Sequence, residues 1–499
     1  MVFSYALMSN LRFNRAVWPI LALVSSIPRI LGAFFLPNGF GDAYVYIGDI
    51  GRLSTKLSNG SFRLTDLFGF WLPLYQFLSA LLNLFVKNGF YSGKLVSATF
   101  GVGVCLFIYA VTFTLTNNRA AAGWMFLVIA LNPLHIFYSA SAMTDIPHAF
   151  LVLGALYFVL KKKWVLAAIF AALAGSTRVE SWMFIALIPL IQIIRERRVS
   201  IVAVLIMILP PLFWFYISWK ATGDWLACFK QRQQYLDWLL MMNPAIAHFS
   251  VINVLRDSVT LLISSDLAVL IACFIAGWFV LQQLLKIHRQ KLSEEAQLIL
   301  PPVVFFLAFF SLLLVAYLTH QQPIIFPRYG LILFTLGLPI LAWAFLRVRR
   351  ERPSLTRHLL IGTIVILSLD ASIQFAGAVG TVNQYRAQRI VAEYLRDHFD
   401  AKSDTRIFCD EGTVKVLSGI PPDKFVTSSD APRDRQSFLS FLDQKNVEYL
   451  VVADDQNSTP YKVIPDLGSD GDLYELVAYS ASTFLPIKIR LWHVKRNAR

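Results

Sequence analysis

Residues 298–318 read LILPPVVFFLAFFSLLLVAYL, a run of 21 residues without a charged side chain. A helix that crosses a bilayer needs about 20 consecutive apolar residues, so this run predicts a membrane-spanning helix. Ten similar runs occur elsewhere in the chain. They lie near 16–36, 94–116, 119–139, 146–160, 164–177, 181–194, 199–219, 262–285, 329–346 and 358–378. The sequence therefore predicts an α-helical polytopic membrane protein with about eleven transmembrane helices.

The composition supports this class. Of the 499 residues, 56% are hydrophobic and only 15% are charged, whereas soluble globular domains carry about 25% charged residues. Ordinary cytosolic enzymes, secreted mini-proteins and disordered chains are thereby excluded. The net charge of +14 is also typical of nucleic-acid-binding proteins. The basic residues cluster at the ends of apolar runs, however, so we expect them to set membrane topology and expect no nucleic-acid partner.

The apolar stretch Trp71–Val86 is shorter, and whether it spans decides the orientation of the helices around it. If it lies along the membrane surface, the dense basic clusters all fall on one side, as the positive-inside rule requires of cytoplasmic loops. If it spans, most of them face outward. We therefore predict a juxtamembrane or re-entrant helix at 71–86 and a cytoplasmic N-terminus. The clusters are Arg12 and Arg15, Arg119, Lys161 to Lys163, Arg195 to Arg198, Lys286 to Lys291 and Arg347 to Arg352.

This orientation places a first outer loop at 37–93 and a polar C-terminal segment on the non-cytoplasmic side. From about residue 381 the chain alternates strand-like with helix-like runs, which predicts an α/β domain. We therefore expect a transmembrane module over 1–380 and an extracytoplasmic α/β domain over 381–499. The strand-like runs are 406–409, 448–452, 473–479 and 487–494, and the helix-like runs are 387–397 and 437–444.

Several ionisable residues lie at the outer ends of the predicted helices, where desolvation makes an unpaired charge costly. Asp42 follows the first helix in the sequence GFGDAYVY (39–46), and Asp49 lies further along. Asp42 either caps a surface helix or acts as a general base.

Asp145 repeats this arrangement at the start of the fourth predicted helix, in SAMTDIPH (141–148). It either caps that helix or joins Asp42 at one membrane face, where it is a candidate metal- or phosphate-ordering group. His148, about one turn later, can belong to such a site or to the helix packing.

Two arginines and a glutamate lie at the same predicted face. Arg178 and Glu180, in GSTRVE (175–180), form either a local ion pair or part of a site. Arg328 precedes Tyr329 at the start of a late helix and is either an interfacial anchor or a phosphate clamp, because a guanidinium binds phosphate bidentately.

Arg29 and Asp370 lie inside the first and eleventh predicted helices, each about 12 Å below the outer boundary. Their equal depth and opposite charge predict an ion pair, with a role beneath a lipid phosphate as the alternative. Arg52, Lys56, Arg63 and Asp66 of the first loop are expected to form a solvated or headgroup-facing surface.

The order of these features resembles the GT-C membrane glycosyltransferases, and among them the family of dolichyl-phosphate-mannose protein mannosyltransferases and lipid A aminoarabinose transferases. The resemblance is clearest over the first six helices. It rests on Arg29 in the first helix, Asp42 early in the first outer loop, Trp-Leu-Pro-Leu at 71–74, Asp-x-Pro at 145–147 and Arg-Tyr at 328–329.

The resemblance implies roles for individual residues. Asp42 matches the family's first acidic position, which implies the general base. Asp145 matches the second-loop acidic position, which implies an organising role for a divalent metal ion or the donor phosphate. The segment around Pro73 matches a region that meets the lipid phosphate. Position 43 is Ala where the family usually has Glu, and no Lys or His adjoins Pro73. Other cations must then bind the phosphate, and the candidates are Arg328, Arg178 and Arg63.

The activity implied is transfer of a sugar, mannose or another hexose, from a polyprenyl-phosphate donor to an acceptor on the non-cytoplasmic side, by single displacement with inversion. The protein would be a multi-pass protein of the cell inner or plasma membrane. Its acceptor is a protein, a glycan or a lipid. The α/β domain either recognises the acceptor or caps the cavity. The alternatives are a transporter or flippase of lipid-linked sugars and a membrane scaffold without catalytic activity.

Overall fold

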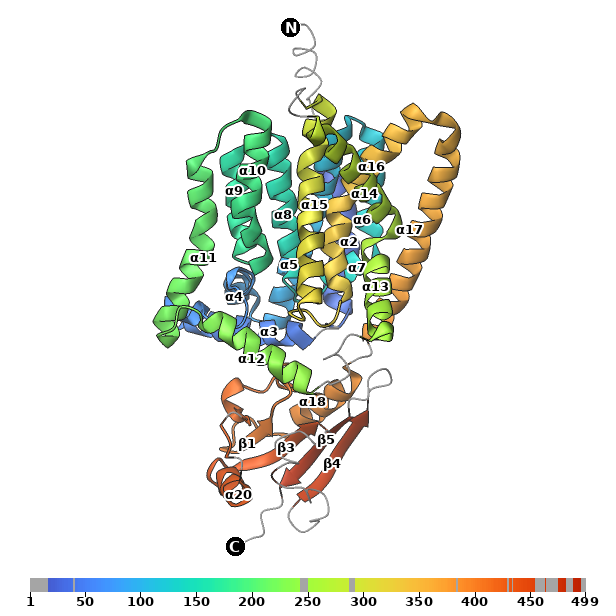
Figure 1. Ribbon diagram of the computed structural model, residues 1–499. Coiled ribbons are helices and arrows are strands. Elements are labelled where there is room, and N and C mark those ends of the chain that lie inside the picture. Colours follow the sequence, from blue (N-terminus) through green and yellow to red (C-terminus); the bar gives the residue numbers. More distant parts are fainter. Residues whose placement is uncertain are drawn as a thin grey trace. The chain divides into compact units, whose positions relative to one another are not determined.

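The computed structural model describes residues 17–38, 41–242, 250–286, 292–382, 385–428, 430–432, 434–453, 463, 474–481 and 488–494. The predictions on Arg12, Arg15, Arg289 and Lys291 lie outside these residues. The chain divides into two compact units. One comprises Met1–Leu36 and Ile50–Ala376, and the other comprises Pro37–Asp49 and Gly377–Arg499. Figure 1 shows helices in the first unit and a sheet with helices in the second.

The first unit is a helix bundle, and each of the eleven predicted apolar runs lies on one of its helices or on a joined pair (Figure 1). The helices are α2 (Val17–Phe35), α5 (Gly89–Thr116), α6 (Arg119–Leu131) joined to α7 (Pro133–Ser139), α8 (Asp145–Leu160), α9 (Trp164–Gly175), α10 (Phe184–Glu196), α11 (Ile201–Thr222), α14 (Leu267–Leu285), α15 (Glu294–Leu318), α16 (Pro327–Glu351) and α17 (Pro353–Val382).

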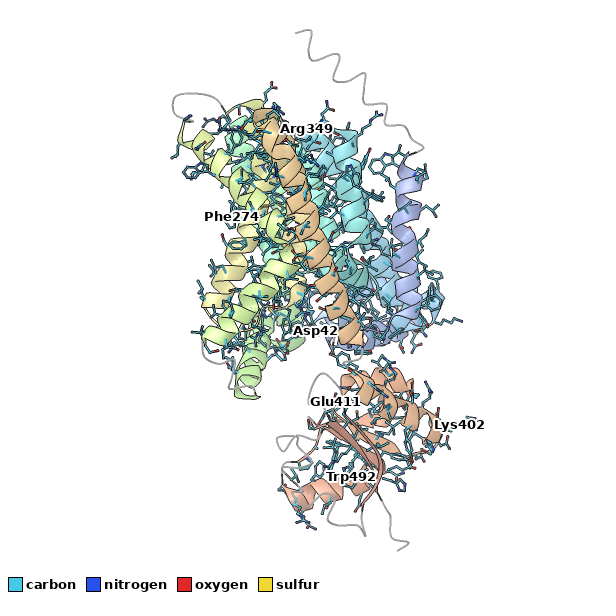
Figure 2. The ribbon with its side chains drawn as sticks, turned by 90° about the vertical axis from the view of Figure 1, so that its right-hand side faces the viewer. Asp42, Phe274, Arg349, Lys402, Glu411 and Trp492 are labelled. Atoms are coloured by element: carbon cyan, nitrogen blue, oxygen red, sulfur yellow. The ribbon has the colours of Figure 1, made fainter. Side chains whose placement is uncertain are left out.

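Seven helices of the described chain are long and apolar enough to cross a bilayer, and the bent pair α6–α7 makes an eighth. The seven are α2, α5, α11, α14, α15, α16 and α17. α8 and α9 are apolar but shorter, with 16 and 12 residues, and α10 has 13 residues. Large apolar side chains face outward, as Phe274 of α14 does with 52% exposure (Figure 2). The prediction of a polytopic membrane protein is confirmed.

The α6–α7 pair bends by 61° because Asn132 and Pro133 interrupt the helix. Proline removes a backbone donor and clashes with the preceding turn, so it begins a new helix. The Asn132 side chain caps α7 by accepting from the His135 N–H, 2.8 Å away. The same side chain donates to Gln374 Oε1 of α17, also at 2.8 Å. The break is thereby tied to a distant helix.

The predicted ion pair between Arg29 and Asp370 is wrong. The buried Arg29 guanidinium donates instead to the carbonyl oxygens of Ile129 and Ala130, each at 3.2 Å. These carbonyls lie at the end of α6, where the helix leaves its last acceptors without intrahelical donors. Asp370 lies near Asp266. Equal depth in the sequence predicted the wrong partners because the packing of α2 against α6 decides which groups Arg29 meets.

The loop between α2 and α5 contains α3 (Gly41–Ser58), η1 (Leu64–Leu67) and α4 (Leu74–Val86). In Figure 1, α4 is seen nearly down its axis while the bundle helices run vertically, so α4 crosses their direction. The Leu74 N–H donates to Ser176 O, 3.2 Å away, and the Phe68 ring lies 5.7 Å from that of Trp214. These contacts hold the loop against α9 and α11. Placement of α4 at the membrane surface stays a prediction.

The ends of several helices that carry basic clusters meet at one end of the bundle. Arg195, at the end of α10, donates to Val159 O of α8 at 2.8 Å. Arg347, near the end of α16, lies 3.6 Å from Glu295 at the start of α15. Arg349 marks this end in Figure 2. This grouping agrees with the assignment of these clusters to one side of a membrane, and the orientation itself stays a prediction.

The second unit contains a five-stranded sheet of order β2-β1-β3-β5-β4. β1 is parallel to both β2 and β3, whereas β5 is antiparallel to β3 and β4. The predicted α/β domain is confirmed in its fold class. The strands are β1 (Arg406–Cys409), β2 (Phe425–Val426), β3 (Val447–Ala453), β4 (Tyr474–Ala481) and β5 (Lys488–Val494), and the helices are α18 (Arg386–His398), α19 (Gly412–Ser418) and α20 (Arg435–Gln444).

Helices cover both faces of this sheet. Successive strand residues point to opposite sides, and both sides of β1 carry apolar side chains that pack against helices. Ile407 and Cys409 of β1 pack with α18 and α19, whereas Phe408 between them packs against α20. The unit also includes Pro37–Asp49, and its second segment begins at Gly377. The predicted boundary after residue 380 lies a few residues after Gly377, and both positions fall within the last turns of α17.

Candidate functional site

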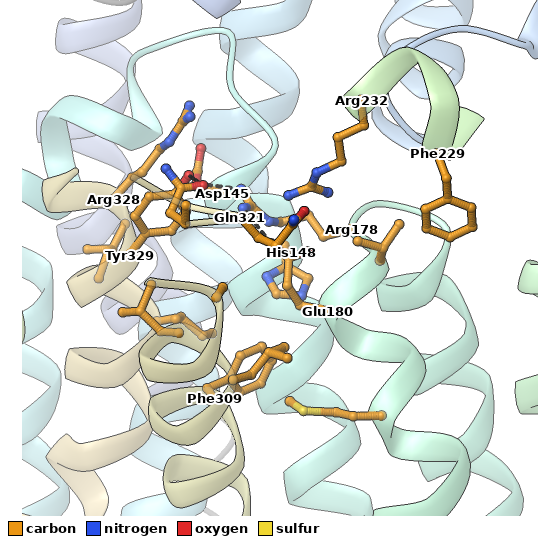
Figure 3. A pocket seen from close by; sticks show the side chains of 18 residues that line it. Asp145, His148, Arg178, Glu180, Phe229, Arg232, Phe309, Gln321, Arg328 and Tyr329 are labelled. Carbon is orange, nitrogen blue, oxygen red and sulfur yellow. Dashed lines mark hydrogen bonds and ion pairs between the residues drawn. The ribbon is translucent and has the colours of Figure 1, made fainter. Parts of the chain in front are cut away.

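A cavity of about 380 Å³ opens in the helix bundle between α8, η2 (Val179–Met183), α12 (Ala227–Met242), α15 and α16. Its polar lining is Asp145, His148, Arg178, Glu180, Arg232, Gln321, Gln322, Arg328 and Tyr329. Its apolar lining is Val179, Met183, Phe229, Phe309, Leu312, Leu313, Ala316, Leu331 and Ile332. Figure 3 shows the arginine side chains toward one end of the cavity and Phe309 toward the other.

Arg178 is the centre of the polar wall. Its Nη1 donates to Asp145 Oδ1 at 2.8 Å, and its Nη2 donates to Glu180 Oε1 at 2.9 Å. The local ion pair with Glu180 was expected from the sequence, but Asp145 lies 33 positions away. One guanidinium thus bridges two elements, because its planar fork presents donors in two directions.

Asp145 is the first residue of α8, yet its side chain bonds to Arg178 rather than capping the helix. The residue is only 7% exposed. Its Oδ2 atom is buried without a hydrogen-bond partner among the described residues. A buried carboxylate oxygen without a donor is costly. Asp145 therefore presents an unused acceptor at the cavity wall.

His148 lies one turn along α8, and its ring continues the polar wall. Its Nε2 is 2.7 Å from Ser181 Oγ of η2, and its ring meets Phe309 of α15 edge-on with centroids 5.7 Å apart. The imidazole is almost completely buried. It therefore joins α8, η2 and α15 at the point where the polar wall becomes apolar.

Arg328 lines the cavity from the first turn of α16. Its guanidinium lies 5.4 Å from the ring centroid of Tyr329 and 5.2 Å from that of Phe326. The Tyr329 hydroxyl donates to Gln322 Oε1 at 2.8 Å, which fixes the ring. Arg178 also approaches the Tyr329 ring, at 5.9 Å. Tyr329 thus makes cation–π contacts with both guanidinium groups.

Arg232 is a cavity residue that the sequence did not reveal. It lies on α12, in a segment where the sequence predicted no site residue. Its side chain extends toward the cavity from that helix (Figure 3). The sequence ACFKQRQQYLDW (227–238) contains both charges and aromatics, but nothing in it distinguishes Arg232 from Lys230. Only the position of α12 beside the bundle selects Arg232.

The other predicted site residues occupy different places. Asp42 is in the first turn of α3, within the segment Pro37–Asp49 of the second unit, and Asp49 ends that segment. Arg63 is exposed and precedes η1, where its N–H donates to Asp66 Oδ2 at 2.8 Å. None of the three is among the residues that line the cavity. Their predicted roles stay predictions.

Arg29 and Asp370, which were predicted to form an ion pair, are not among the residues that line the cavity either. The segment around Pro73 contacts the chain just before Arg178, because the Leu74 N–H donates to the carbonyl oxygen of Ser176, two residues before that arginine.

The carboxylates of the cavity do not form a metal-binding set. Asp145 and Glu180 each bind the Arg178 guanidinium, and a divalent cation there would replace an existing positive charge. In the part of the chain that the structure describes, no three His, Cys, Asp or Glu side chains are grouped as metal ligands would be. These residues do not fit the metal expected at Asp145, and Arg178 occupies the place of a cation.

The charges in the cavity alter the pKa values of their neighbours. Burial by itself lowers the pKa of Arg178, but Glu180 and Asp145 outweigh this and raise it. Burial by itself raises the pKa of Glu180, but Arg178 outweighs it and lowers this pKa to about 2. Both residues therefore carry full charge at neutral pH.

We expect the thermal stability of the protein in detergent to fall as the pH is lowered from about 4.5 toward 2. The pKa of Glu180 is lower in the folded protein than the usual 4.5. Its stabilising contribution is therefore present above pH 4.5 and is lost as the pH falls through the folded value. Differential scanning fluorimetry of wild type and Glu180→Gln would measure this. The variant should lose less stability over this range, and Glu294→Gln, at an exposed glutamate of α15, should behave as wild type. Equal losses in all three proteins would contradict the role of Glu180.

No family model and no curated protein matches the sequence. Among solved structures, the chain is similar to ArnT from Cupriavidus metallidurans in the apo state. The sequence identity is 13%, the TM-score is 0.61, and the match covers 96% of this chain and 98% of that chain. A second structure of that protein, bound to undecaprenyl phosphate, matches over the same shares with 10% identity and a TM-score of 0.55. The chain therefore shares the fold of that protein over nearly its whole length.

Proposed function

We propose that the protein is a membrane glycosyltransferase that transfers a sugar from a polyprenyl-phosphate donor to an acceptor on the non-cytoplasmic side. The observation that carries this proposal is a cavity with arginines at one end and an apolar wall at the other, inside a helix bundle (Figure 3). A polyprenyl phosphate has the same division between an anionic head and an apolar tail. The solved relative with this fold was crystallised with undecaprenyl phosphate.

In this proposal the arginines stabilise the phosphate as it leaves. The acceptor hydroxyl oxygen attacks the anomeric carbon, the bond from that carbon to the phosphate oxygen breaks, and polyprenyl phosphate departs with an additional negative charge. Arg178, Arg232 and Arg328 provide positive charge where this negative charge develops, which lowers the barrier. Asp42 takes the proton of the acceptor hydroxyl as general base. The configuration at the anomeric carbon is inverted.

The charge of the cavity favours a donor with a neutral sugar, such as mannose or another hexose. Its lining holds three arginines, one aspartate and one glutamate, which leaves one net positive charge. A phosphodiester with a neutral sugar carries one negative charge and balances it. An amino sugar would add a positive charge to a site that already carries one.

The sites of donor and acceptor imply an orientation in the membrane. The N-terminus is then cytoplasmic, and the second unit lies on the non-cytoplasmic side. The acceptor is a protein, a glycan or a lipid. The basic ends of α10 and α16 would face the cytoplasm, as the positive-inside rule requires.

We expect purified protein to release polyprenyl phosphate from labelled polyprenyl-phosphate hexoses, with a membrane extract as the source of acceptor. Release should be greater from neutral-sugar donors than from an amino-sugar donor. Arg328→Gln should raise the donor KM about tenfold, since a hydrogen bond to a charged group contributes about 1.5 kcal/mol or more.

Arg198→Gln is the matched control in this experiment, because it removes an arginine whose side chain is 74% exposed and lies outside the cavity lining. It should leave the donor KM unchanged. An amino-sugar donor preferred over all hexoses would contradict the assignment of the sugar. Absence of release from every donor would favour a transporter or flippase of lipid-linked sugars, or a scaffold, over a transferase.

A further inference from the structure

The segment that carries Asp42 folds with the C-terminal unit. Pro37–Asp49 clusters with Gly377–Arg499, whereas α3 from Ile50 onward belongs to the helix bundle. Ala43 and Tyr44 of this segment are almost completely buried. The chain around the proposed base is therefore held by residues more than 300 positions away in the sequence.

Tyr385, immediately before α18, makes the contacts that hold this segment. Its hydroxyl oxygen lies against Gly41, the first residue of α3. The first N–H groups of a helix have no acceptor within the helix, and the hydroxyl lies beside the first of them. The Tyr385 ring also meets the ring of Tyr44 edge-on, with centroids 5.6 Å apart.

The fit between Gly41 and Tyr385 is close. A Cβ atom at position 41 would lie 3.2 Å from the Tyr385 hydroxyl oxygen, which is tighter than ordinary van der Waals contact. The Tyr44 hydroxyl donates to Asn38 O at 3.0 Å. Gly41 and Tyr44, both in the first turn of α3, are thus each held by a contact with a residue outside the helix.

Asp42 is close enough to Tyr385 for its charge to act on the phenol. Burial is the main cause that raises the pKa of Tyr385 to about 12, and the charge of Asp42 adds to it. The phenol is therefore neutral at physiological pH and remains a stable hydrogen-bonding group. On the other side, Glu411 follows β1 and bonds to Gln388 of α18, which ties the start of α18 to the sheet.

We propose that Tyr385 is a positioning residue for the reaction, which holds the first turn of α3 so that the Asp42 carboxylate keeps one orientation. The C-terminal α/β unit then has a role in catalysis through Asp42, in addition to any contact with the acceptor. This inference rests on the proposed function, in which Asp42 is the base. Small displacements of a base can reduce turnover strongly while substrate binding is unaffected.

Tyr385→Phe tests this proposal, because it removes the hydroxyl and keeps the ring. Tyr394→Phe is the matched control on the same helix, where the tyrosine stacks on His398 with centroids 4.0 Å apart. We expect Tyr385→Phe to lower kcat about tenfold or more with the donor KM unchanged, and Tyr394→Phe to leave both unchanged. Gly41→Ala, which presses on the same hydroxyl, should lower kcat as well.

A double variant separates positioning from a general structural effect. If Tyr385 acts through Asp42, Tyr385→Phe should cause no further loss in an Asp42→Asn background, since residues that act as a unit are not additive. Full additivity, or equal effects of Tyr385→Phe and Tyr394→Phe, would overturn the proposal.

Hydrogen–deuterium exchange gives a second readout that does not depend on activity. Peptides that cover residues 41–46 should exchange faster in Tyr385→Phe than in wild type or Tyr394→Phe. Unchanged exchange would show that Tyr385 does not hold this turn and would overturn the proposal. A further outcome is that the wild-type protein exchanges more slowly than Tyr385→Phe and still lacks transferase activity. That result would show that Tyr385 holds the first turn of α3, but it would overturn both the catalytic role of Tyr385 and the proposed function.

Discussion

Replacing Arg178 by methionine is expected to abolish activity and to lower the stability of the folded protein by about 3–5 kcal/mol. Arg178 is the hydrogen-bonded partner of both Asp145 and Glu180. The Arg178 side chain is 18% exposed and that of Asp145 is 6% exposed. Removal of the guanidinium leaves two carboxylates close together in a poorly solvated site, where each had been compensated by the same cation. Thermal unfolding in detergent and donor turnover measure the two effects.

Arg178→Lys separates the charge from the geometry. Lysine keeps the positive charge, but its ammonium is a compact group that does not reproduce the planar fork of arginine. We expect this variant to fold and to lose about a hundredfold in kcat, which is typical of the loss of a preorganised donor at a developing negative charge.

The matched control for both variants is Arg198, whose side chain is 74% exposed and pairs with Glu196. Arg198→Met and Arg198→Lys should change stability by no more than about 0.5 kcal/mol and leave turnover unchanged. A folded Arg178→Lys protein with wild-type kcat would show that bridging by Arg178 is not needed for the reaction.

Asp42→Asn is expected to reduce kcat by about 10² to 10⁴, the usual contribution of a general base. Asparagine has nearly the same shape as aspartate, but it cannot take the proton of an acceptor hydroxyl. The donor KM should change little, because the arginines of the cavity, not Asp42, are proposed to bind the phosphate. Release of polyprenyl phosphate from a labelled donor measures both constants.

Asp66→Asn provides the comparison in the same loop. Asp66 pairs with Lys56 and bonds to the Arg63 N–H, so its substitution tests whether the loss of a negative charge from this loop lowers turnover by itself. It should have little effect on kcat. A folded Asp42→Asn protein with unchanged turnover would remove Asp42 from the mechanism.

The helices of the bundle could be predicted because membrane insertion depends on local hydrophobicity. All eleven apolar runs lie on helices or helix pairs. The bend between α6 and α7 carried a local signal as well, in Asn132 and Pro133, but its angle of 61° depends on contacts with other helices. In the C-terminal unit, β1, β3, β4, β5, α18 and α20 were likewise visible, because a strand alternates its faces and a surface helix has a period of 3.6 residues. The short elements β2 and α19 were not predicted.

The candidate site could be predicted only in part. Asp145, His148, Arg178, Glu180 and Arg328 were selected as ionisable residues at helix ends, and all five line one cavity. Each of the five lies at or near the end of an apolar run. Such an end can be recognised from neighbouring residues, so the sequence was enough to select them. Arg232 was missed because it lies on a polar helix where a charged side chain is unremarkable by sequence criteria.

The sequence by itself determined the polytopic helical class, the places of the apolar helices, the α/β character of the C-terminal unit and the helix ends where charged groups collect. The reason is that burial in lipid and the periods of helices and strands are recorded in neighbouring residues. Only the tertiary structure decided that Arg178 bridges Asp145 and Glu180, and that Arg29 binds carbonyls 100 and 101 positions away. Such partners depend on which helix faces pack together, and no local pattern in the chain specifies that packing.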